Sequence, residues 1–127
     1  MNNYSLQKPS LLKALAIITL VNGILNIIYG ITVTAAIVLG TFFVGIICAP
    51  ITMLPIVLGV FEILYAAKLL VNPPQPVKPA TTLAVLEITM IISGNIISLI
   101  AGILTLVFYN DVGVREYFAR LNGQITS

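Results

Sequence analysis

A long apolar stretch near the start of the chain constrains the fold more than any other feature of the sequence. From Leu11 to Val71 the only charged side chains are Lys13, Glu62 and Lys68. As one helix these roughly 60 residues would be about 90 Å long, against about 30 Å for the hydrocarbon core of a membrane. Only 8% of the 127 residues are charged, about a third of the usual share in soluble domains. The sequence therefore excludes a soluble fold and predicts that lipid surrounds most of the surface.

Prolines and β-branched residues divide the apolar sequence into candidate membrane spans. The segment 71–79 holds four prolines, which no helix tolerates, so it is expected to be a polar loop. Pro50 and the segment 30–34 are expected to break the first apolar run, and a second run extends from Leu83 to Tyr109. The sequence predicts an all-α transmembrane helix bundle in a single membrane domain, residues 1–127. The four expected spans cover about residues 10–31, 35–49, 51–70 and 82–108.

The second of these spans is the weakest, because it has about 15 residues where a crossing helix needs about 17–25. Three full spans, with 35–49 re-entrant or an extended loop, are the alternative. Four spans would place Lys68 and Lys78 on the opposite side from the other four basic residues. With either count the positive-inside rule places the N-terminus in the cytoplasm. The C-terminus lies on the same side only when the chain has four spans.

The sequence after the last span predicts a short amphipathic helix over about 111–122. Asp111 is a suitable N-cap, and Gly123 is a suitable stop. The apolar residues of this segment recur at helical spacing and are Val114, Tyr117, Phe118 and Leu121. About 12 residues are too few to cross a membrane. The helix is therefore expected to lie in the interface with its aromatic side chains toward the acyl chains, although a partner protein would fit the same face.

Two acidic residues lie inside the predicted spans, where an ionisable group is costly and marks a functional hypothesis. At 1.5 Å per residue, Glu62 lies about 12 Å from the end of the third span and Glu87 about 8 Å from the start of the fourth. Because the proline-rich loop joins these spans as an antiparallel hairpin, the two carboxyls have similar depths. Two carboxylates that share an apolar site cannot both ionise cheaply, so the pair would hold a proton or a cation. In the alternative, a neighbouring helix or Lys68 satisfies Glu62, and water or Lys78 satisfies Glu87.

A second group of polar and small residues lies near the predicted midplane. Asn22 and Asn26 share a face of the first span, and Asn95 lies about 20 Å into the fourth. Buried amides need partners, and hydrogen bonds between helices supply them. The small residues of the fourth span recur at intervals of four and are Gly94, Ser98 and Gly102. We expect the fourth span to pack closely against the first span or against its copy in another protomer, with a polar permeation path as the alternative.

The residue types in the chain exclude several chemistries. There is no His and a single cysteine, Cys48, so His/Cys metal sites and an intrachain disulfide are excluded. Without a nucleophile–base pair or a Gly-rich phosphate loop, we expect no catalytic residue, no metal, no cofactor and no enzyme activity. The six basic residues form no patch, so no nucleic-acid partner is expected.

In its hydropathy, with four predicted spans and short polar loops, the chain resembles small prokaryotic four-span membrane proteins of unassigned function. The resemblance covers most of the chain and carries no diagnostic motif. The size and span count are also similar to those of the small multidrug resistance transporters, which use a glutamate in the first span as a shared proton and substrate site. Here the first span carries Asn22 and Asn26 and no acid, so no site residue is carried over.

Two functional hypotheses follow from the sequence. In the first, the protein is a non-enzymatic membrane protein that acts through helix–helix association, either as an accessory subunit of a membrane complex or as a self-associating scaffold. The small-residue groove, the short loops and the amphipathic C-terminal helix favour it. In the second, an oligomer of the chain is a proton- or cation-coupled transporter or channel that uses Glu62 and Glu87 as ion sites.

Overall fold

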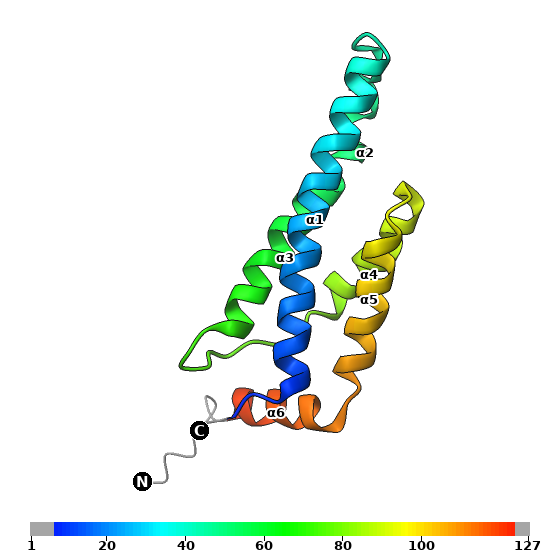
Figure 1. The fold of residues 1–127 in the computed structure, drawn as a ribbon. Helices are drawn as coiled ribbons and strands as arrows, with labels where there is room; N and C mark the ends of the chain where they lie inside the picture. The colour runs from blue at the N-terminus through cyan, green and yellow to red at the C-terminus, as the bar shows by residue number, and fades with distance from the viewer. Residues whose placement is uncertain (1–6, 124–127) are drawn as a thin grey trace.

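Two helical hairpins of unequal length form the protein, and a short helix closes one end of both (Figure 1). The computed structural model describes residues 7–123, and within this range all regular structure is helical. The all-α prediction is therefore confirmed for these residues. The elements are α1 (Ser10–Gly40), the 3-10 helix η1 (Val44–Cys48), α2 (Ala49–Thr52), α3 (Leu54–Leu70), α4 (Thr81–Thr89), the 3-10 helix η2 (Met90–Ser93), α5 (Ile96–Tyr109) and α6 (Val112–Gly123).

The longer hairpin consists of α1 and the returning segment Val44–Leu70. The expected turn at 30–34 is wrong, because α1 runs through it as one helix of 31 residues, about 46 Å long. Inside a membrane the helix is the conformation that satisfies every backbone group, so a β-branched run stays helical there. Gly30 serves packing instead of a turn, since a Cβ at this position would lie 2.5 Å from Ile56 Cγ1 of α3.

The chain reverses at Thr41–Phe43, inside the expected second span of residues 35–49. Phe42 and Phe43 both adopt positive φ, at 50° and 70°, which is uncommon for a bulky residue. The Thr41 hydroxyl supports the turn by donating to Ile37 O at 2.7 Å and accepting from Gly45 N at 2.6 Å. The segment 35–49 is therefore the end of one helix and the start of the next rather than a span.

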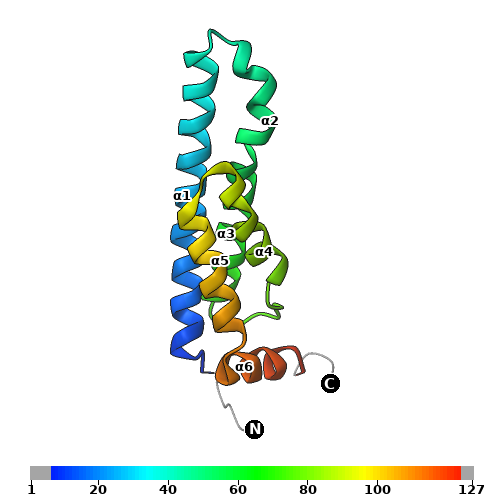
Figure 2. The ribbon, with the colours of Figure 1, turned by 90° about the vertical axis from the view of Figure 1, so that its right-hand side faces the viewer.

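The shorter hairpin replaces the expected fourth span of residues 82–108. The chain reverses at Gly94, whose φ of +81° ends η2 in the left-handed region, and α5 begins after Asn95. The two halves pack closely, because a Cβ at Gly102 of α5 would lie 2.6 Å from Ala84 O of α4. At about 1.5 Å per residue, α5 is about 21 Å long, less than the thickness of the hydrocarbon core. The longer hairpin extends well beyond this turn (Figures 1 and 2).

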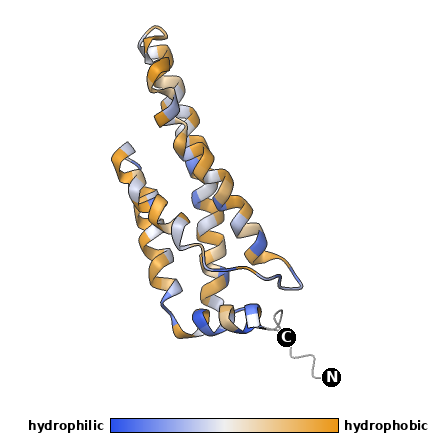
Figure 3. Cartoon of the chain, turned by 180° about the vertical axis from the view of Figure 1, so that it is seen from behind, coloured by the Kyte–Doolittle hydropathy of each residue, from blue (hydrophilic) through white to orange (hydrophobic). Residues whose placement is uncertain are grey.

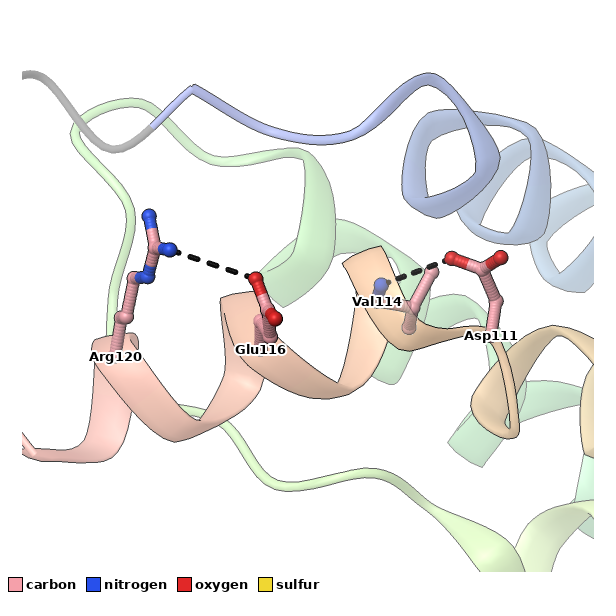
Figure 4. Close-up of polar contacts among 4 residues, drawn as sticks. All are labelled: Asp111, Val114, Glu116 and Arg120. Atoms are coloured by element: carbon pink, nitrogen blue, oxygen red, sulfur yellow. Dashed lines mark hydrogen bonds and ion pairs between the residues drawn. The ribbon is translucent and has the colours of Figure 1, made fainter.

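Helix α6 lies across the base of both hairpins, at 72° to α5. Asp111 Oδ1 accepts from Val114 N at 3.1 Å and caps the helix, while Arg120 and Glu116 form an exposed ion pair at 3.4 Å (Figure 4). The apolar face of α6 is buried against α1, α3 and α5 of the same chain. This core consists of Leu12, Leu15, Ala16, Leu69, Tyr109, Val114, Tyr117, Phe118 and Leu121. The aromatic side chains of α6 thus pack on protein and not on acyl chains, because the first turns of α1 present leucines to them.

All six basic residues gather at this base, which consists of the start of α1, the end of α3, the loop 71–80 and α6. Lys8 Nζ donates to Asn72 Oδ1 at 3.0 Å, and Asn122 Nδ2 donates to Val77 O at 3.2 Å, so the loop is tied to both ends of the described chain. The hydropathy colouring concentrates hydrophilic residues on α6 and the loop (Figure 3). The four-span expectation that Lys68 and Lys78 lie opposite the other basic residues does not describe this fold.

Two segments of the described chain, Ser10–Gly40 and Val44–Leu70, are long and apolar enough to cross a membrane. A third crossing is reached only when α5 and α6 are taken as one bent span. Large apolar side chains are exposed along the whole longer hairpin, up to 89% at Phe42 in its turn. These surfaces indicate a membrane protein in which two hairpins extend from one polar base.

Candidate functional site

Polar side chains from four helices meet in the interior of the bundle, between α1, α3, α4 and α5. We call this group the polar cluster. It consists of Asn22, Asn26, Glu62, Glu87, Asn95 and Ser98, all of which are buried. Every one of these residues was a candidate from the sequence. The structure therefore brings together the two acids and the amides, which the sequence had placed in separate groups.

Glu62 of α3 is the best-satisfied member of the polar cluster. Its side chain is fully buried. Asn22 Nδ2 donates to Glu62 Oε1 at 2.9 Å, and Asn26 Nδ2 donates to Glu62 Oε2 at 2.8 Å. Each carboxyl oxygen of Glu62 thus accepts one amide hydrogen bond. Of the alternative partners expected from the sequence, the neighbouring helix α1 satisfies this carboxyl, so Lys68 is not needed.

Glu87 of α4 is equally buried but poorly satisfied. Only 1% of the residue is exposed. Its carboxyl interacts with the carboxyl of Glu62 and with the amide of Asn22. Its Oε2 atom has no hydrogen-bond partner among residues 7–123. Two carboxyls therefore share a buried site in which one oxygen of Glu87 has no hydrogen-bond partner among the described residues, and such a site can hold a proton or a cation there.

The start of α5 supplies the third side of the polar cluster. Asn95 caps α5, because its Oδ1 atom accepts from Ser98 N at 3.1 Å. The amide of Asn95 then donates to Asn26 Oδ1 at 2.6 Å. The Ser98 hydroxyl lies 3.4 Å from the amide nitrogens of both Asn22 and Asn26. The break between α4 and α5 is thus bonded to α1 through this cluster.

Glycines let the helices approach closely enough to form the polar cluster. A Cβ at Gly59 of α3 would lie 2.4 Å from Gly23 O of α1. Gly102 allows the same close approach of α5 to α4, because a Cβ at Gly102 would lie 2.9 Å from the Cβ of Glu87. The predicted groove of Gly94, Ser98 and Gly102 is therefore filled by the protein's own helices. Gly94 itself forms the turn.

The structure also reveals polar residues that the sequence did not single out. Thr19 of α1 is buried one turn before Asn22. Near the base, the Tyr65 hydroxyl donates to Lys78 O at 2.9 Å and lies 3.1 Å from the Tyr109 hydroxyl, and Ala80 N donates to both hydroxyls at 3.1 Å. The spacing of three between Thr19 and Asn22 is the signal that would have placed Thr19 on the polar face.

An apolar groove on the outer side of the bundle leads to Asn22. The groove has a volume of about 280 Å³ and lies between α1 and α5. Its apolar walls include Ile17, Ile18, Val21, Leu25, Ile97 and Ile100. Since Asn22 also lines it, the polar cluster borders this groove.

Comparisons of the chain with protein-family models, with curated proteins and with solved structures found no match. The function is therefore argued from the geometry of the polar cluster alone.

Proposed function

We propose that this protein is a proton- or cation-coupled membrane transporter or channel in which Glu62 and Glu87 bind the ion. The observation that carries the proposal is the complete burial of both carboxyls in the bundle interior. A purely structural role accounts for Glu62, which accepts two amide hydrogen bonds. It does not account for Glu87, which leaves one buried oxygen without a partner in the described chain.

The turn of the shorter hairpin supports the same proposal. In membrane proteins, helices are interrupted inside the bilayer mainly where the freed backbone lines a cavity or a binding site. Here the interruption at Gly94 and Asn95 lies beside the carboxyl pair, because Asn95 donates to Asn26 and Asn26 donates to Glu62. A movement of the α4–α5 hairpin would therefore change the surroundings of the ion site.

The gathering of the basic residues supports an orientation as well. Cytoplasmic segments carry an excess of Lys and Arg, so we place the base, with both ends of the described chain, in the cytoplasm of a prokaryotic inner membrane. A reporter fused to the C-terminus that is active only in the cytoplasm checks this orientation.

Ion flux into liposomes tests the proposed function. In the double variant Glu62→Gln, Glu87→Gln we expect proton or cation flux to fall about tenfold or more, because an amide neither carries an exchangeable acidic proton nor balances a cation. Flux is measured with an internal pH- or sodium-sensitive dye after an imposed gradient. Glu116→Gln, which changes an exposed carboxyl of α6, is the matched control and should transport like the wild type. Unchanged flux in the double variant, with wild-type helical content, would contradict the proposal.

A second candidate function, self-association, is favoured by the length of the longer hairpin. Helix α1 is about 46 Å long, about 16 Å more than the hydrocarbon core. Its turn carries exposed Phe42, Phe43 and Ile47, which water would not cover favourably. A second copy of this chain, packed against the part of the hairpin that α4 and α5 leave uncovered, would shield them.

The single cysteine makes the self-association testable without engineering. Cys48 is exposed in η1, beside the turn of the longer hairpin. Treatment of native membranes with a short bifunctional maleimide should yield a covalent dimer of this chain, identified by mass. Cys48→Ala provides the control and should remain monomeric. A monomer that is fully modified at Cys48 but never crosslinked would count against association through this surface.

A further inference from the structure

The polar cluster contains more hydrogen-bond acceptors than donors. Two of its buried side-chain oxygens, and one on the neighbouring Thr19 of α1, have no hydrogen-bond partner among the described residues. They are Thr19 Oγ1, Asn22 Oδ1 and Glu87 Oε2, on residues that are each at most 3% exposed. Buried oxygens without partners are uncommon in proteins, and each is costly. Three of them, one on Glu87 and two on the helix whose amides bond Glu62, indicate a place for an electropositive ligand.

The donors of the cluster are directed elsewhere. The amides of Asn22 and Asn26 donate to Glu62, and the amide of Asn95 donates to Asn26. As a result Glu62 receives two amide donors, whereas Glu87 Oε2 receives none. The amide of Asn22 joins both acids, because it bonds Glu62 and also interacts with the Glu87 carboxyl.

Two of the three oxygens come from one helix face, because Thr19 and Asn22 are three residues apart on α1. The third comes from Glu87 of α4, whose carboxyl interacts with the side-chain amide of Asn22. Hydroxyl, amide and carboxylate oxygens are hard ligands, which suit hard cations.

We propose that the polar cluster binds a monovalent alkali-metal cation, with Thr19 Oγ1, Asn22 Oδ1 and Glu87 Oε2 as its protein ligands. This proposal deepens the proposed cation-coupled function and rests on the same site. The small number of unpartnered oxygens favours a monovalent ion over a divalent one. Ca²⁺ and Mg²⁺ need about six or more oxygen ligands. A single proton can be shared by at most two oxygens, whereas one metal ion can bind three.

Thermal unfolding of the full-length protein in detergent tests the site with sodium as the probe. Raising NaCl at constant ionic strength, with choline chloride as the replacement, should raise the Tm saturably by about 5 °C or more. Thr19→Val and Glu87→Gln should each abolish this sodium response. Thr19→Ser keeps a hydroxyl and should retain it. Thr105→Val, which changes a buried threonine of α5, should respond like the wild type.

The outcomes separate this proposal from the proposed function. Equal Tm values of the wild type in sodium and choline would overturn the alkali-metal site, and so would a full sodium response in Thr19→Val. If the flux of the Glu62→Gln, Glu87→Gln variant still falls in that case, the proposed function stands with a proton as the coupling ion. A sodium response that requires Thr19, together with unchanged flux in that double variant, supports the site and contradicts the transport function. If Thr19→Val does not fold, the comparison of Glu87→Gln with wild type decides the matter.

Discussion

Replacement of Gly59 by valine is expected to separate α1 from α3 and to destabilise the protein by about 3 kcal/mol or more. A Cβ at Gly59 would lie 2.4 Å from Gly23 O and 2.9 Å from Ile27 Cγ1. The first of these atoms belongs to a helix backbone and cannot move without shifting the whole of α1. The same Cβ at Gly59 would lie 3.2 Å from the Cβ of Asn26. A shift of α1 therefore also breaks the hydrogen bond from Asn26 to Glu62.

The measurement is the free energy of unfolding, followed by circular dichroism during denaturation in mixed micelles. Gly40→Ala is the matched control, because a Cβ at Gly40, the last residue of α1, has no atom within 4 Å in the described structure. Its effect should stay within about 1 kcal/mol, the difference in helix propensity between the two residues. Equal stability of Gly59→Val and Gly40→Ala would show that the two helices do not approach as closely as described.

The acids show how far sequence reasoning reaches in this protein. The depth of Glu62 and Glu87 follows from counting residues to the proline-rich loop, and antiparallel helices on either side of that loop place the two side chains at one level. The amides Asn22 and Asn26 share a helix face by their spacing alone. That these amides bond Glu62 and leave Glu87 Oε2 without a partner in the described chain depends on the rotation of α1 against α3. No local pattern encodes that rotation.

The errors in the predicted spans have a common cause. Residues 83–109 form one apolar run, so the sequence predicts a single span in which Gly94 is a packing residue. The sequence Ser93-Gly94-Asn95 nevertheless combines a typical helix stop with a typical N-cap, and these two signals mark the reversal. The turn at Phe42 and Phe43 carries no such signal, because bulky residues rarely adopt positive φ.

The C-terminal helix illustrates a different limit. Its extent and its apolar face follow from the cap at Asp111 and from a spacing of three and four. Whether that face contacts lipid or protein depends on the neighbouring surface. The leucines at the start of α1 supply this surface only because both hairpins begin and end at the same base.

Replacement of Asn26 by leucine is the second change with a large expected effect. Asn26 is completely buried, donates to Glu62 Oε2 at 2.8 Å and accepts from Asn95 Nδ2 at 2.6 Å. Leucine fills a similar volume but leaves a carboxylate oxygen and an amide without partners. Hydrogen bonds to charged groups contribute about 1.5–3 kcal/mol each, so the free energy of unfolding should fall by about 3 kcal/mol. Asn110→Leu, at an exposed position after α5, is the matched control and should cost about 1 kcal/mol or less.

A double-mutant cycle separates the loss of these hydrogen bonds from a simple packing defect. Glu62→Leu removes the carboxyl to which Asn26 donates. Replacing both partners of a buried hydrogen bond by apolar groups often changes the free energy of unfolding little. The Asn26→Leu, Glu62→Leu protein should therefore be more stable than the sum of the two single effects predicts, by about 1 kcal/mol or more. Additive losses would mean that Asn26 and Glu62 do not stabilise one another. The polar cluster would then be a set of independent buried groups, with no shared site for an ion.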